Sequence, residues 1–139
     1  MGRMRGAGLA VTVAFIAGLS GCSFLPGSRS ACLPVLEVAP SPAVAGDSIT
    51  VTAPDPCEVD VPDGGWEIVV TLEGGDPVLT RTTTQPFDGA FELTLDLPAD
   101  LPPGQAYVDI ANWTSVPCDD TGTSSCASPA RPFEVVAPE

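Results

Sequence analysis

Five cysteines are the side chains of this chain best suited to covalent chemistry, and their spacing separates one from the other four. Cys22 stands alone at the end of an apolar run. The remaining four do not have the CxxC spacing of zinc or redox motifs, because 24, 60 and 7 residues separate successive members. An even set is typical of disulfides in exported proteins and allows three connectivities. These four are Cys32, Cys57, Cys118 and Cys126.

The chain has no histidine, and this absence limits the reactions that it could catalyse. Ser/His/Asp triads, Cys/His pairs and histidine-based zinc or copper sites are excluded on residue types alone. Among the common catalytic mechanisms, only those that use carboxylate side chains remain. A glycosidase pair of carboxylates needs a cleft, which a single small β-domain rarely builds. We therefore expect no enzymatic activity and no cofactor.

An acidic run between residues 55 and 63 is the one candidate for metal binding. Carboxylate oxygens suit Ca²⁺, but this spacing does not match the EF-hand loop. A solvated acidic loop is the commoner explanation, and the sequence leaves calcium binding open. The four acidic residues are Asp55, Glu58, Asp60 and Asp63.

The first 21 residues have the layout of an export signal. Arg3 and Arg5 precede thirteen uncharged, mostly apolar residues, Ala7 to Leu19, followed by small residues. A membrane-spanning helix needs about 20 apolar residues, so this run is too short to be one and is better explained as a helical signal peptide.

The residues that end this run, LSGC at positions 19 to 22, resemble the bacterial lipobox. In bacterial lipoproteins the cysteine of this motif carries diacylglycerol, the signal is cut just before it, and the new N-terminus is usually acylated. The resemblance implies a lipid on Cys22 that holds the mature chain to the extracytoplasmic side of the cell membrane. The alternative is an ordinary secretory signal that is cleaved near a cysteine by chance.

The mature chain would be strongly acidic. Removing residues 1–21 leaves three arginines, no lysine and all 18 acidic residues, a formal charge of −15. Such a surface repels phosphate backbones and anionic headgroups, so we expect no nucleic-acid partner. Acyl chains rather than basic residues would have to hold the protein to the membrane.

From Cys32 onward apolar residues alternate with polar ones at period two, which predicts β-strands. The alternation is clearest in WEIVVTLE (66–73) and FELTLDL (91–97), and it recurs near residues 49–53, 107–110 and 133–135. Turn signals such as PDGG, EGGDP and PADLPPG separate these runs. Six or seven short strands in this length predict an all-β protein, an antiparallel β-sandwich that buries one face of each sheet.

Two longer segments, VAPSPAVAGDSITVTAPDPC (38–57) and FDGAFELTLDLPADLPPGQAYVDI (87–110), resemble bacterial immunoglobulin-like domains, as does the position of Trp66. The resemblance implies an immunoglobulin-like sandwich over residues 32–139, preceded by a signal peptide (1–21) and a lipidated tether (22–31). The chain lacks the disulfide that joins the two sheets of antibody domains. The resemblance therefore implies a fold and places no functional residue.

Within this fold, the disulfide pairing follows from strand register. If residues 34–39 and 48–53 pair across the PSPAVAGD turn, facing residue numbers sum to about 87 to 89, and Cys32 with Cys57 satisfies this. A sum of 244 for the last hairpin would suit Cys118 with Cys126 and would place Tyr107 opposite Ala137 and Trp113 opposite Arg131. We expect these two pairs, although cross-pairing at the same end of the sandwich stays open.

Three further features could contact a partner, each with a simpler explanation. The loop CDDTGTSSC (118–126) could present a constrained surface, or be pinned only because it is long and polar. Tyr107 and Trp113 could form an exposed aromatic patch, or cover a sandwich edge. Asn112 begins a glycosylation sequon, which matters only outside bacteria.

Two functions therefore remain as expectations. The first is a cell-envelope lipoprotein whose domain binds a protein or a cell-wall polymer, and the second is a spacer or accessory subunit without a ligand of its own. Only ten residues separate Cys32 from Cys22 along the chain, a reach of about 30 Å. The cysteine-bearing end would then face the membrane, with the loops 43–47 and 74–77 pointing outward.

Overall fold

A computed structural model describes residues 32–116 and 127–139. Eight strands and one 3-10 turn form within these residues. Their bounds are β1 Glu37–Ala39, β2 Ala43–Val44, β3 Ser48–Ala53, β4 Trp66–Leu72, β5 Pro77–Thr83, β6 Phe91–Asp96, β7 Gly104–Ile110, η1 Trp113–Ser115 and β8 Arg131–Val136.

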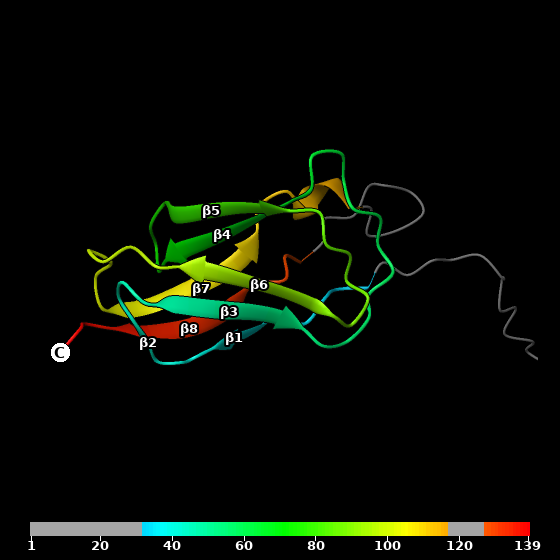
Figure 1. Ribbon diagram of the computed structural model, residues 1–139. Helices are drawn as coiled ribbons and strands as arrows, with labels where there is room; N and C mark the ends of the chain where they lie inside the picture. The colour runs from blue at the N-terminus through cyan, green and yellow to red at the C-terminus, as the bar shows by residue number, and fades with distance from the viewer. Residues whose placement is uncertain (1–31, 117–126) are drawn as a thin grey trace, which may run out of the picture.

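The strands make two sheets that pack face to face, as Figure 1 shows. The smaller sheet has the order β1-β3-β6 and the larger has the order β2-β8-β7-β4-β5. Every pairing is antiparallel except that of β2 with β8. The predicted β-sandwich is confirmed, with one strand more than the six or seven expected. The expected signal helix lies outside the described residues.

The core is built by the alternation seen in the sequence. In β3 the side chains of Ile49, Val51 and Ala53 are fully buried, and Thr50 and Thr52 between them are half-exposed. The same alternation places Trp66, Ile68 and Val70 of β4 and Phe91 and Leu95 of β6 between the sheets. Burying each large apolar side chain stabilises the fold by about 1.5–3 kcal/mol. The two sheets are held together by this shared interior.

Strand β5 was not recognised as a separate strand from its sequence. It pairs only with β4, at the edge of the larger sheet, and most of its residues are exposed. Its threonines favour a strand, but its apolar residues do not alternate as in a half-buried strand. The sequence signal is weak because most side chains of this edge strand are exposed, and few apolar residues such as Leu79 pack against the core.

The segment PSPAVAGD was expected to be a simple turn, and it instead carries the chain from one sheet to the other. After β1 two cis peptide bonds precede Pro40 and Pro42. The chain then forms β2, in which Ala43 pairs with Val135 of β8 in the larger sheet. A tight turn returns the chain to β3, with Asp47 N–H donating to the Val44 carbonyl at 3.0 Å. The first strand is thus divided between the two sheets.

The two register predictions had different outcomes. In the β1–β3 pair Glu37 faces Thr52, so the numbers sum to 89, within the predicted range. In the β7–β8 pair the predicted sum of 244 is wrong, because Tyr107 faces Pro132 rather than Ala137. The sum of 244 would have placed Glu134 opposite the buried Ile110. The observed register instead pairs Ala106 with Phe133, two buried residues, because a register of the wrong parity turns side chains to the wrong face.

Candidate functional site

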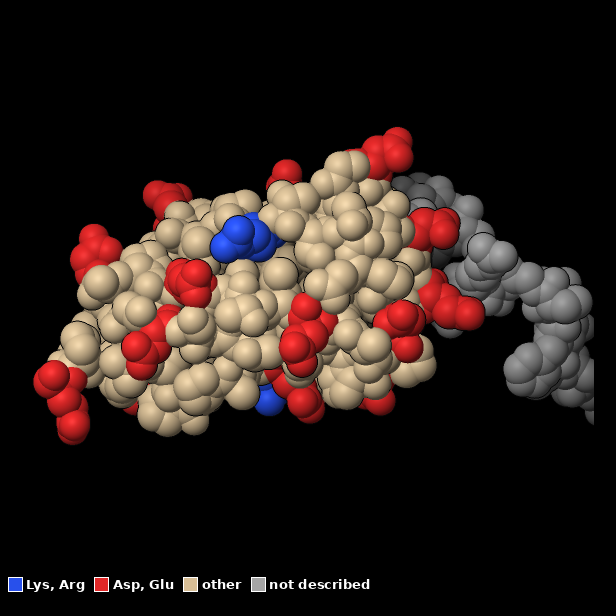
Figure 2. Space-filling model, in the orientation of Figure 1, with Lys and Arg blue, Asp and Glu red and all other residues tan. Residues whose placement is uncertain are grey.

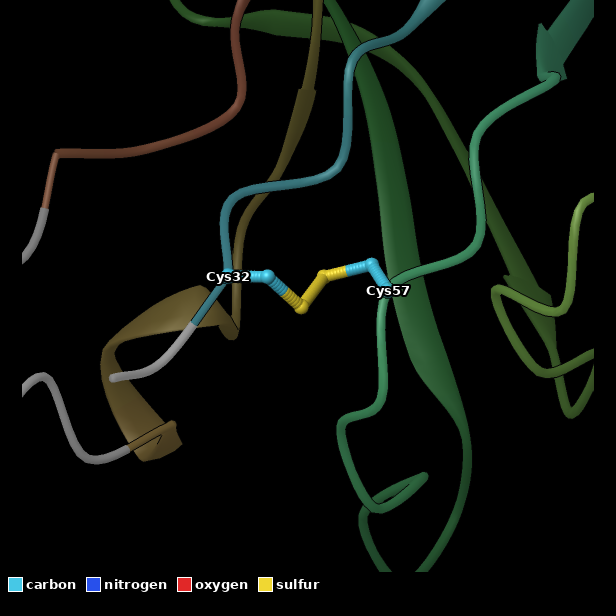
Figure 3. Close-up of a disulfide and its surroundings, with 2 residues drawn as sticks. All are labelled: Cys32 and Cys57. Carbon is cyan, nitrogen blue, oxygen red and sulfur yellow. A yellow bond between two sulfur atoms is a disulfide. The ribbon is translucent and has the colours of Figure 1, made fainter. Parts of the chain in front are cut away.

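A disulfide joins Cys32 to Cys57 at one end of the sandwich, as Figure 3 shows. The two Cα atoms are 5.6 Å apart, a separation usual for disulfides. The backbone N–H of Cys57 also donates to the carbonyl of Phe87 at 2.7 Å. The start of the domain is therefore fixed to the segment between β3 and β4. This predicted pair is confirmed, whereas Cys118 and Cys126, like Cys22, lie outside the described residues.

Four aromatic rings lie together in the core at this end, which we call the cystine end. Trp66 lies 5.4 Å from both Phe87 and Trp113, measured between ring centroids, and Phe87 lies 4.7 Å from Phe91. All four side chains are buried. The cystine and these rings make this end of the domain a well-packed unit.

The expected aromatic surface patch of Tyr107 and Trp113 is not formed. Trp113 is only 2% exposed, because the chain leaves β7 after Ile110 and the turn η1 folds the indole over Trp66. Tyr107 is half-buried on the outer face of the larger sheet, opposite Thr71 and Pro132. The alternative, that the two side chains cover a sandwich edge, does not describe them either, because Trp113 lies in the core and Tyr107 lies on β7, the central strand of the larger sheet.

Asn112, the first residue of the sequon, ties two segments of the cystine end together. Its Oδ1 accepts a hydrogen bond from the backbone N–H of Glu67 at 2.9 Å, and its Nδ2 donates to the carbonyl of Gly65 at 2.9 Å. Both contacts join the end of β7 to the start of β4. The side chain of Asn112 therefore has a structural role, which the sequon motif did not reveal.

The acidic side chains that the structure describes do not converge on a point where a metal ion could bind. Among residues 32–116 and 127–139, no group of three or more carboxylate or cysteine side chains is arranged to hold one. In the run 55–63 the side chains of Asp55, Glu58 and Asp60 are exposed. Figure 2 shows the carboxylates scattered over the visible face. This arrangement is that of a solvated acidic surface.

The opposite end of the domain, which we call the distal end, is formed by three connections and the C-terminus (Figure 1). The connections are residues 45–47, 73–76 and 97–103. Their backbones are closed by local hydrogen bonds, such as that from Gly75 N–H to the Leu72 carbonyl at 3.0 Å. The two loops expected to point away from the cysteine-bearing end do lie at the distal end. Their orientation relative to a membrane stays a prediction.

Comparison with known proteins adds no relative: no protein-family model matches the chain, and no curated protein matches it. Within the part of the chain that the structure describes, no helix has the length and apolar character needed to cross a membrane. Inferences about function therefore rest on the residues and geometry of this chain.

Proposed function

We propose that the protein is a cell-envelope lipoprotein, anchored through acyl chains on Cys22, whose β-sandwich binds a protein or an envelope polymer. The observation that carries the proposal is the disulfide at Cys32, only ten residues after Cys22 along the chain. It fixes the tether to one end of the domain. The distal end then stands furthest from the attachment point and is free to meet a partner.

The distal end sets the chemistry of such a partner. Its connections expose the carboxylates of Asp47, Glu73, Asp76 and Asp100 and no large apolar side chain. Contact there would be polar, and a partner with cationic groups or hydrogen-bond donors suits it. A nucleic acid or another polyanion would be repelled by the same carboxylates.

The spacer function remains the second candidate, and one observation favours it. Only three large hydrophobic side chains are exposed within the described residues: Leu33, Val35 and Val78. A contiguous apolar patch of several hundred Å² marks many binding surfaces, and none of these three side chains belongs to the connections of the distal end. A spacer would need only the fixed attachment and the rigid core.

Two measurements, made one after the other, test the proposal. Intact-mass analysis of the protein purified from membranes should show the mature chain starting at Cys22 with acyl chains attached. An unmodified Cys22, or a mature terminus elsewhere, would refute the anchor. The binding function is tested separately, once the anchor is established.

For binding, the lipidated protein would be crosslinked in intact envelopes and recovered in detergent. A triple variant at the distal end, Asp47→Asn, Asp76→Asn and Asp100→Asn, should lose a specific partner. A control with the same charge change near the cystine end, Asp55→Asn, Asp60→Asn and Asp63→Asn, should retain it. Recovery of no partner above background by the unmodified chain would favour the spacer.

A further inference from the structure

Two of the three exposed large hydrophobic side chains lie together at the cystine end. Leu33 is 47% exposed and Val35 is 53% exposed, and both lie within three positions of Cys32. Pro34 and Leu36, which alternate with them, are buried. Leu33 and Val35 therefore point to the same side of the extended chain, away from the core.

The opposite chain segment supplies two more apolar side chains beside them. The β1–β3 register pairs Glu37 with Thr52, and the disulfide continues the same register to Cys32 and Cys57. The segments 33–36 and 53–56 run between these two fixed points, so Pro54 and Pro56 belong to the segment that accompanies Leu33 and Val35. Both prolines are exposed.

We call these four residues the apolar strip: Leu33, Val35, Pro54 and Pro56. Gly89 lies beside the strip, since a Cβ at that position would be 3.3 Å from the Pro54 carbonyl oxygen and 3.8 Å from Pro56 Cδ. No large side chain at position 89 covers it. Asp55 is the one charged residue within the segment that carries the two prolines.

The length of the tether points to what covers this strip. The strip begins one residue after Cys32, which lies ten positions after Cys22, a reach of at most about 30 Å when the chain is extended. If Cys22 carries acyl chains, the strip stays within reach of the bilayer at all times. Tethering of this kind gives an effective concentration of about millimolar, at which a weak apolar contact is sufficient.

We propose that the apolar strip lies on the bilayer surface, so that the domain rests on the membrane through its cystine end. This inference rests on the proposed lipid anchor. Glu37 and Glu58, both exposed near the strip in sequence, oppose anionic headgroups. The contact should therefore be strongest on zwitterionic lipid and weaker on anionic lipid.

The experiment uses the full lipidated chain in phosphatidylcholine nanodiscs that contain a lipid with a spin-labelled headgroup. Paramagnetic relaxation of methyl groups is the measurement, with Val78 as an internal control, because it is 37% exposed but lies on β5. We expect the relaxation enhancement at Leu33 and Val35 to exceed that at Val78 severalfold. Replacing about a third of the lipid by phosphatidylglycerol should reduce the difference.

A matched variant, Leu33→Ser with Val35→Ser, should lower the enhancement at the nearby Val38 methyl groups to the level of Val78. Unchanged near-UV circular dichroism would show that the variant is folded. Equal enhancement at Leu33, Val35 and Val78 in the unmodified chain would overturn the inference and leave the anchor intact. If Leu33 is shielded from solvent but shows no paramagnetic relaxation enhancement, a protein or the tether covers the strip. That result would also overturn the inference. An unmodified Cys22 in the mass spectrum would instead refute the anchor itself.

Discussion

The pair of glycines before β4 offers a direct test of how tightly the cystine end is packed. Gly64 and Gly65 have nearly equal positive φ angles, 91° and 89°. Their surroundings differ. A Cβ at Gly65 would lie 2.6 Å from the carbonyl oxygen of Thr83, whereas a Cβ at Gly64 would meet nothing within 4 Å. Alanine at either position would adopt an unfavourable positive φ. Only at Gly65 would its methyl group also collide with β5.

The expected losses of stability follow from the backbone conformational cost and from the steric collision. An L-residue in the left-handed region costs about 1–2 kcal/mol, so Gly64→Ala should lower the free energy of unfolding by about that amount. A methyl group forced against a packed backbone adds about 1–3 kcal/mol, so Gly65→Ala should cost about 2–5 kcal/mol. The Thr83 carbonyl belongs to β5, whose Thr83 pairs with Trp66, so it cannot move away without disturbing the sheet.

Urea denaturation, followed by the fluorescence of the buried tryptophans, measures both free energies of unfolding. The two variants should keep the same m-value and differ in midpoint, with Gly65→Ala unfolding at lower urea. If the two variants lose the same stability within about 0.5 kcal/mol, the close approach of Gly65 to β5 is wrong.

Three further substitutions test other contacts, each by denaturation. Replacing Cys32 and Cys57 together by alanine removes a link across 25 positions of sequence and should cost about 3 kcal/mol; a loss below about 1 kcal/mol would mean that the disulfide adds little. Asn112→Ala removes two hydrogen bonds and should cost about 1–3 kcal/mol, and an unchanged midpoint would refute the role of this side chain. Gln85→Met should cost about 0.5–1.5 kcal/mol, because the Gln85 side-chain amide both donates to and accepts from the Glu92 backbone at the open edge of β6. An unchanged denaturation midpoint would count against these two hydrogen bonds.

The strands that the sequence predicted best are those with one buried face. In β3 and β6 the alternation of apolar and polar residues follows directly from the packing of each sheet against the other. The Cys32–Cys57 pair was predictable for the same reason, since the short connection between β1 and β3 limits the register. These features depend on local pattern and on neighbouring strands.

The features that the sequence did not predict depend on contacts between distant residues. The β7–β8 register is set by burial of Phe133 against Ala106, and a long connection between the strands allowed other registers. Trp113 is buried because η1 turns it toward Trp66, which lies 47 residues earlier in the chain. The tethering role of Asn112 likewise depends on segments that meet only in the folded domain.

The position of the Cys32–Cys57 bridge has a mechanical consequence. Tension from an anchor at residue 22 would enter the domain at Cys32, and without the bridge it would peel the three-residue β1 from β3 one rung at a time. The bridge passes the load directly to Cys57, four positions after the end of β3, a strand paired with β6 along all six of its residues. Since the C-terminus lies at the far end (Figure 1), a pull between the two ends would load these strands in shear. Reducing the bridge would convert a shear-resistant domain into one that unzips from its cystine end.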